Sequence, residues 1–276
     1  MNAALIAGSR GLYYIAVMLL FGTSAFAALL RAHLPVIAPP RLRALRWTAL
    51  AAAIVTGCAW AALAARQMAD ALDSQVLVQT ATDTLFGQLF LVRMGVLALL
   101  AVTLALSRGH RAAALLAAIA LILPAATSHA ASSSPAGFTA IGIVLDAVHL
   151  LTAGFWIGGL AVLALLFARK EANIVLALSL FSDWAMVAVL LLAMTGLIDG
   201  VQIVLGDKGA ASPLYLAVLG TKLLLVTAML ALAAVNRFRL MPKGGDGIAR
   251  NVALELGLGA IVVLLAGALG QLQPTL

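Results

Sequence analysis

Eight long runs of apolar residues leave this 276-residue chain few ways to fold. A bilayer core requires about 20 apolar residues per α-helix, because backbone polar groups inside lipid must bond within the segment that crosses it. Each run is long enough to cross. The sequence therefore predicts an all-α, polytopic membrane protein, a single eight-helix transmembrane domain over residues 1–276. Its spans are expected near 11–34, 47–65, 85–106, 112–128, 139–167, 180–204, 213–235 and 251–271.

Composition excludes a water-soluble protein. Hydrophobic residues make up 64% of the chain and charged residues 10%, against about 45–50% and about 25% in soluble domains. A soluble fold of this size could not bury so much apolar surface. In a soluble protein the net charge of +7 would suggest a nucleic-acid partner. Here membrane lipid is the expected partner and nucleic acid is not, because basic residues in a membrane protein report orientation.

Basic residues are distributed unevenly between the two sides of the predicted bundle. The connections after the first, third, fifth and seventh spans carry twelve: Arg31, Arg41, Arg43, Arg46, Arg108, Arg111, Arg169, Lys170, Arg237, Arg239, Lys243 and Arg250. The other side carries three, Arg10, Arg66 and Lys208. Because loops rich in Lys and Arg stay in the cytoplasm, both termini are predicted to be periplasmic, which for a bacterial chain places it in the inner membrane. The loop 66–84 could form a short interfacial helix, and 174–183 is expected at the cytoplasmic interface.

Four ionisable side chains lie inside predicted spans at similar depth, roughly 10–15 Å below the periplasmic surface. They are Arg93, Asp146, His149 and Lys222. A charge inside a span costs about 2.5–3.5 kcal/mol on insertion scales, so each requires a reason. One interpretation is that Arg93, Lys222 and Asp146 pair with each other and hold the bundle together.

The second interpretation is a metal site that opens to the periplasm. Imidazole is the commonest metal ligand, and Asp146, three residues before His149 on one helix face, would orient it. His129, in the loop before the fifth span, would fold back over His149. Met94 and Met194 could add thioethers, which favour Cu(I) over Cu(II), although methionine in an apolar helix is more often core filler.

Further residues are assigned by their position in the spans. Asp199 is expected to line the same vestibule, and Trp156 lies too deep for a belt residue and is expected to pack beside the polar cluster. Gly158 and Gly159 would let a neighbouring helix approach closely. Asp183 and Glu255, toward the cytoplasmic side, are interfacial anchors or an exit path. No nucleophile–base constellation, phosphate loop or catalytic carboxylate pair is present, so no enzymatic activity is predicted.

The run DAVHLLTAGFWIGGL (146–160) resembles the pattern D-x-x-H-L-L-x-x-x-x-W-x-G-G-L of the copper-resistance D (CopD/PcoD-like) family. Other segments resemble the family in the same order: RGLYYIAVMLLFG, TLFGQLFLVR, SHAA, SPLYLAVLGTKLLLV and VNRFRLMP. The resemblance implies an inner-membrane protein of copper homeostasis and resistance that moves copper from periplasm to cytoplasm, with a periplasmic copper-binding partner of the CopC type. It also carries over functional residues: His129, Asp146, His149, Trp156, Gly158, Gly159, Arg93, Lys222, Asn236 and Arg237. Tyr13 stands where many members carry histidine, so no ligand role is carried over there.

Two other functions remain open on the sequence. One is a haem-binding membrane redox protein, which would need pairs of histidines on facing helices. The other is a non-transporting membrane scaffold or sensor that docks a periplasmic copper chaperone. The sequence assigns no oligomeric state.

Overall fold

The computed structural model describes residues 2–33, 40–69, 73–106, 109–127, 136–169, 174–206, 212–243 and 247–273, and these ranges contain helices but no strand. In chain order the longer helices are α1 (Asn2–His33), α2 (Pro40–Ala69), α3 (Ser74–Asp83), α4 (Leu85–Ala105), α5 (His110–Ile122), α7 (Ala136–Arg169), α8 (Ile174–Gly206), α9 (Pro213–Val235) and α10 (Ile248–Leu269). Short turns extend two of them: η1 (Leu123–Thr127) follows α5, and the π-helical η2 (Asn236–Leu240) and η3 (Met241–Lys243) follow α9.

Seven of the described helices are long and apolar enough to cross a membrane, which confirms the all-α polytopic membrane fold. The predicted span 112–128 corresponds to a shorter apolar helix, His110–Ala126. The predicted interfacial helix in loop 66–84 is α3, which Asp73 caps by accepting a hydrogen bond from the Val76 N–H at 2.8 Å. The segment 174–183 does not form a separate interfacial element but is the first part of α8, because neither Gly nor Pro interrupts it.

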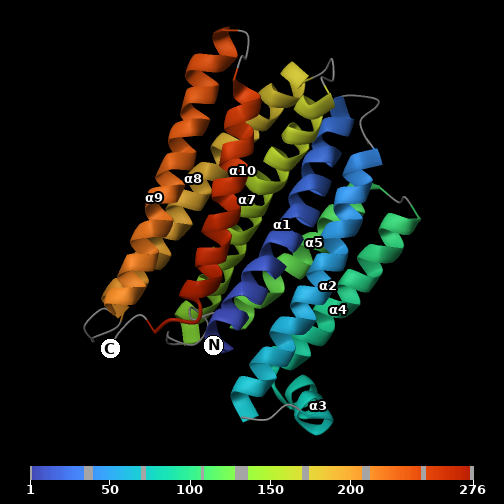
Figure 1. Ribbon diagram of the computed structural model, residues 1–276, viewed down its shortest axis with the longest axis vertical. Coiled ribbons are helices and arrows are strands. Elements are labelled where there is room, and N and C mark those ends of the chain that lie inside the picture. Colours follow the sequence, from blue (N-terminus) through green and yellow to red (C-terminus); the bar gives the residue numbers. More distant parts are fainter. Residues whose placement is uncertain are drawn as a thin grey trace.

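The helices lie along one axis, and both chain ends are found at the same end of the bundle, together with α3 (Figure 1). We call this the terminal end. Helix α1 is central and packs against α2, α5, α7 and α10, while α8 packs on α7 and α9 on α10. The fold thus has two sides that share α1: α2, α4 and α5 on one side, and α7 to α10 on the other.

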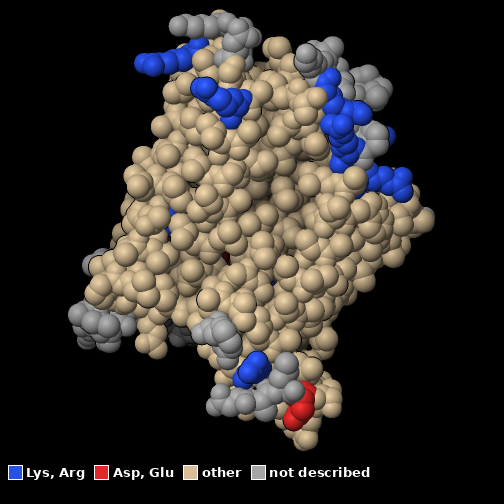
Figure 2. Space-filling model, in the orientation of Figure 1, with Lys and Arg blue, Asp and Glu red and all other residues tan. Residues whose placement is uncertain are grey.

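The opposite end of the bundle is rich in basic residues. Figure 2 shows most of the visible Lys and Arg gathered there, whereas the acidic side chain that stands out on this face lies beside α3 at the terminal end, near a basic one. Helices begin or finish at this basic end with Arg31, Arg41, Arg43, Arg111, Arg169, Arg239 and Arg250. The fold therefore collects on one end the loops that the sequence predicts to be cytoplasmic, and the periplasmic position of the termini stays a prediction.

Contact between α1 and α7 requires glycine. A Cβ on Gly158 would overlap the backbone of Gly22, and a Cβ on Gly22 would overlap the backbone of Gly154 and Gly158. A Cβ on Gly159 would overlap the ring of Phe181 on α8. These small residues therefore let α7, the helix of the copper-resistance motif, lie directly against α1, as small residues do in other membrane bundles.

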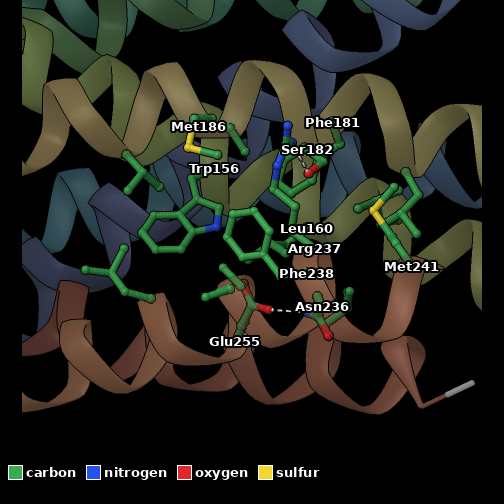
Figure 3. A pocket seen from close by; sticks show the side chains of 18 residues that line it. Trp156, Leu160, Phe181, Ser182, Met186, Asn236, Arg237, Phe238, Met241 and Glu255 are labelled. Carbon is green, nitrogen blue, oxygen red and sulfur yellow. Dashed lines mark hydrogen bonds between the residues drawn. The ribbon is translucent and has the colours of Figure 1, made fainter. Parts of the chain in front are cut away.

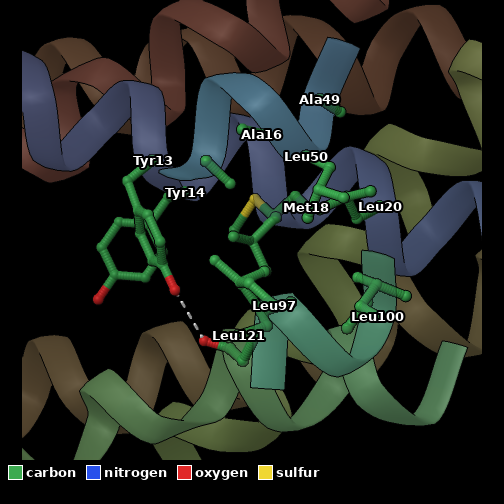
Figure 4. Close-up of a cluster of buried hydrophobic side chains, with 14 of the residues drawn as sticks. Tyr13, Tyr14, Ala16, Met18, Leu20, Ala49, Leu50, Leu97, Leu100 and Leu121 are labelled. Atoms are coloured by element: carbon green, nitrogen blue, oxygen red, sulfur yellow. Dashed lines mark hydrogen bonds between the residues drawn. The ribbon is translucent and has the colours of Figure 1, made fainter. Parts of the chain in front are cut away.

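The α1, α2, α4 and α5 side is closed by a tightly packed apolar cluster, part of which is drawn in Figure 4. Tyr13 is fully buried in it, and its hydroxyl donates a hydrogen bond to the Ala120 carbonyl at 3.1 Å. This phenol thus ties α1 to α5. The α7 to α10 side encloses cavities instead, and it holds most of the predicted site residues.

Candidate functional site

A cavity of about 940 Å³ lies between α1, α7, α8, α9 and α10 in the terminal-end half of the bundle. We call it the large cavity. Its walls are mainly apolar, and its lining includes two basic side chains, one carboxylate and one imidazole: Arg10, Lys222, Asp146 and His149. Arg10 also donates to the Gly270 carbonyl at 3.1 Å, which ties the start of α1 to the end of α10. Three of the four residues that the sequence placed at one depth therefore meet in one space.

His149 is positioned by α8. Its Nδ1 lies 2.9 Å from Thr195 Oγ1, and that hydroxyl donates its own proton to the Leu191 carbonyl at 2.8 Å. With the hydroxyl proton used in this way, the tautomer protonated at Nδ1 satisfies the contact by donating to Thr195 Oγ1, and that tautomer keeps the lone pair on Nε2. Gly196 leaves room for the ring, since a Cβ there would lie 3.3 Å from His149 Cε1. Thr195 is an orienting partner that the sequence did not predict, and the orienting role of Asp146 stays a prediction.

Lys222 is surrounded by carboxylates from two other helices. It interacts electrostatically with Asp199 of α8 and Asp146 of α7. Asp199 Oδ1 is buried and makes no hydrogen bond to the described residues. Opposite charges from three helices therefore compensate one another beside His149, which keeps a polar surface in the membrane without a large net charge.

Arg93 lies elsewhere, although it was expected to share the cluster of Asp146 and Lys222. It is 2% exposed, on the α1, α2 and α4 side. Its Cζ lies 4.9 Å from the ring centroid of Trp60 and 5.4 Å from that of Tyr13, with the rings of Phe86 and Phe90 also near. Similar depth did not bring the charges together because α4 turns Arg93 toward aromatic rings, whose faces attract the guanidinium.

The two predicted methionines also lie outside the large cavity. Met94 packs beside Gly57 in the cluster of Arg93, and Met194 is 60% exposed on the outer face of α8. Two other thioethers line the cavity, Met18 and Met229. Met229 follows Lys222 by seven residues, two helical turns on one face, so helical periodicity could have found it.

Metal ligands of the classical kinds are sparse in the part of the chain that the structure describes. It contains no group of three or more His, Cys, Asp or Glu side chains placed to hold one ion. His129 lies outside the described residues. The large cavity therefore combines one imidazole, one carboxylate and two thioethers, a set that suits a soft ion better than a hard cation, which would need several oxygen ligands.

Trp156 is the wall between the large cavity and a second cavity toward the basic end. This small cavity, of about 160 Å³, lies among α7, α8, α9, η2 and α10. Trp156, which is 3% exposed, lines both cavities, as do Val189 and Leu230. Trp156 was expected beside the polar residues, and in that position its indole separates the large cavity from the small cavity.

Buried polar side chains stand around the small cavity (Figure 3). Asn236 Nδ2 donates to Glu255 Oε1 at 2.7 Å, and Asn251 Nδ2 donates to Asn236 Oδ1 at 2.8 Å. Glu255 is 2% exposed. The sequence offered Glu255 as an interfacial anchor or an exit path, and its burial against a cavity makes it no anchor.

Arg237 closes the small cavity at the basic end. It donates to Ser182 Oγ at 2.5 Å and pairs with Asp183 at 3.1 Å, which links η2 to α8. The wider π-helical turn of η2 presents Asn236 and Arg237 together to the cavity. The sequence placed Arg237 among the basic residues that report orientation, and the contacts of Asn236 and Arg237 could not be predicted because they cross from η2 to α8 and α10.

Long apolar helices, one basic end and paired charges at depth define a multi-pass membrane protein with a polar crevice. Comparison with known families gives the particular class. Residues 1–138 match the family described as copper resistance protein D-like, N-terminal domain, and residues 175–269 match the family described as copper resistance protein D. The chain belongs to the copper resistance D family, and it is a multi-pass protein of the bacterial inner membrane.

Two relatives illustrate the likeness. Copper resistance protein D of Pseudomonas syringae pv. tomato is 30% identical over 223 residues, which covers 70% of this chain and 70% of that protein. Copper transport protein CutJ of Bacillus subtilis (strain 168) is 28% identical over 208 residues, 70% of this chain but 38% of CutJ. No solved structure matches the chain. The motif of α7, residues 146–160, lies between the two matched family ranges, so neither family match covers it.

Proposed function

We propose that this protein carries copper across the inner membrane, from periplasm to cytoplasm, through the crevice between α7, α8, α9 and α10. The observation that carries the proposal is the alignment of the two cavities along these helices. On α7 the large cavity is lined between residues 146 and 157 and the small one between 156 and 163. The lining passes from one cavity to the other at Val189 on α8 and at Leu230 on α9.

His149 is the proposed entry ligand. In the tautomer whose Nδ1 donates to Thr195, Nε2 has a free lone pair, as a metal-binding imidazole requires. The lining residues of the large cavity include one imidazole, so one ion is proposed to bind there at a time. Met18 and Met229 offer that ion soft thioether donors, which favours Cu(I) as the species carried.

The direction follows from the orientation that the basic residues predict. The large cavity lies in the half of the bundle that carries the termini, which would face the periplasm. A periplasmic copper-binding protein of the CopC type would deliver its ion there. The names of the relatives, copper resistance protein D and copper transport protein CutJ, support copper as the cargo.

Vesicles made with the full-length protein test the proposal. Lipid vesicles that enclose a Cu(I)-selective dye should report copper entry faster with the wild-type protein than without protein. His149→Ala should reduce entry to the protein-free rate, whereas Met194→Leu, which removes an outward-facing thioether, should leave it unchanged. Wild-type protein that binds copper but admits none would refute transport and favour a scaffold or sensor.

The haem alternative finds little support in the described histidines. His110 bonds through Nδ1 to Arg46 at 2.9 Å, where α5 begins at the basic end, and His149 lies in the other half of the bundle. These two imidazoles cannot act as axial ligands of one haem. A preparation with a Soret absorption band would nevertheless overturn the copper proposal.

A further inference from the structure

The small cavity contains a buried carboxylate without a basic partner. Glu255 lies inside a membrane-spanning helix, and the side chains of Asn236 and Trp156, which donate hydrogen bonds to it, are neutral. The basic residue of the cavity, Arg237, is paired with Asp183 instead. No salt bridge joins Glu255 to a cation in the described part of the chain. A carboxylate within lipid needs compensation. Here a neutral amide and a neutral indole donate hydrogen bonds to Glu255, and no positively charged side chain among the described residues forms a salt bridge with it.

Soft, polarisable groups share the cavity with this carboxylate. The thioethers of Met186 and Met241 line it, and so does the indole of Trp156. In Figure 3 the sulfur of Met186 stands beside the Trp156 ring, and Glu255 approaches the cavity from α10 below them. Thioethers select soft metal ions, and the face of an indole attracts a cation.

Charge decides which cation fits. One carboxylate balances one positive charge, so a monovalent ion gives a neutral site in a medium where net charge is costly. A divalent ion would leave an excess charge, and the cavity offers it one carboxylate and no imidazole among its lining residues. The donor set therefore fits a soft monovalent cation.

We infer that the small cavity is a second, inner binding station for a soft monovalent cation, held by Met186, Trp156 and Glu255. The inference rests on the proposed function, since this station would receive the ion after it leaves His149 and passes Trp156. The chain would then hold two ions, one at His149 in the large cavity and one in the small cavity on the other side of the indole.

Silver binding tests the station, because Ag⁺ imitates Cu(I) without redox chemistry. Full-length protein in detergent is titrated with Ag⁺, and bound metal is counted per protein. The double variant M186L/E255Q should bind one ion fewer than wild type. Gln can still accept the hydrogen bond from Asn236, so the fold is retained while charge and sulfur are removed. Met194→Leu, on the same helix but outside the cavity, is the matched control and should bind as wild type does.

Tryptophan fluorescence gives a second readout that does not depend on the double variant folding. In His149→Ala, Ag⁺ should still quench fluorescence, and the quenching should disappear when Trp156→Phe is added. Persistent quenching in that protein, or wild-type silver stoichiometry in M186L/E255Q, would overturn the inner station.

The two proposals fail separately. If M186L/E255Q loses an ion but wild-type vesicles admit no copper, the station stands and transport is refuted. If vesicles admit copper through the wild-type protein while M186L/E255Q binds as many ions as wild type, transport stands and the station is refuted.

Discussion

The bond between Thr195 and His149 makes the proposed copper site testable through a residue that need not touch the metal. Thr195→Val keeps the shape of the side chain and removes the hydroxyl that accepts from Nδ1 at 2.9 Å. The imidazole then loses the partner that fixes its tautomer, and Nε2 is no longer held as the unprotonated nitrogen. We expect copper affinity to fall while the bundle remains folded.

The expected change in copper affinity is larger than the expected change in stability. Side-chain hydrogen bonds between membrane helices contribute about 0.6 kcal/mol on average and about 1.7 kcal/mol at most. Loss of a group that orients a metal ligand lowers affinity about 10–100-fold, equivalent to about 1.4–2.7 kcal/mol. Affinity should therefore respond more strongly than the melting temperature.

Competition with a chromophoric Cu(I) chelator measures that affinity in purified protein. Thr227→Val is the matched control, because Thr227 also lines the large cavity but bonds only to the Leu223 carbonyl of its own helix, at 2.9 Å. Thr195→Ser should retain affinity, since it keeps the hydroxyl. Unchanged copper affinity in Thr195→Val would refute the assignment of His149 Nε2 as a ligand held by α8.

Three further predictions concern topology and stability. A fluorescent protein that folds only in the cytoplasm should stay dark when fused to the C-terminus, and a bright fusion would refute the periplasmic termini. Asp146→Ala should lower the melting temperature of metal-free protein in detergent, because Lys222 loses one of its two carboxylate partners and retains Asp199. The loss of stability should be a part of the roughly 3–5 kcal/mol that breaking a buried ion pair costs. Asp183→Ala removes a partner from an exposed ion pair and should change the melting temperature less. Gly158→Ala should lower the melting temperature because its Cβ would overlap α1, whereas Gly220→Ala meets nothing within 4 Å, and equal stability of the two variants would contradict the close α1–α7 contact.

The sequence by itself was enough for the fold class and for the end-to-end polarity of the bundle. Runs of about 20 apolar residues have one stable form in lipid, so helices could be placed without knowing their neighbours. The short helix α3 was also within reach, because a mixed polar segment of the loop lies between two spans. The full length of α8 could not be predicted, since an uninterrupted apolar helix has no local signal that marks where the interface ends and the span begins.

Only the tertiary structure decided which buried charges share a site. Depth along a helix can be counted from the sequence, and it correctly suggested that Asp146, His149 and Lys222 could meet. It also suggested Arg93, which faces aromatic rings on the other side of α1. The direction in which a side chain points depends on how each helix is rotated against its neighbours. That rotation is set by packing, including the glycine contact of α1 with α7, and no single segment of the chain contains it.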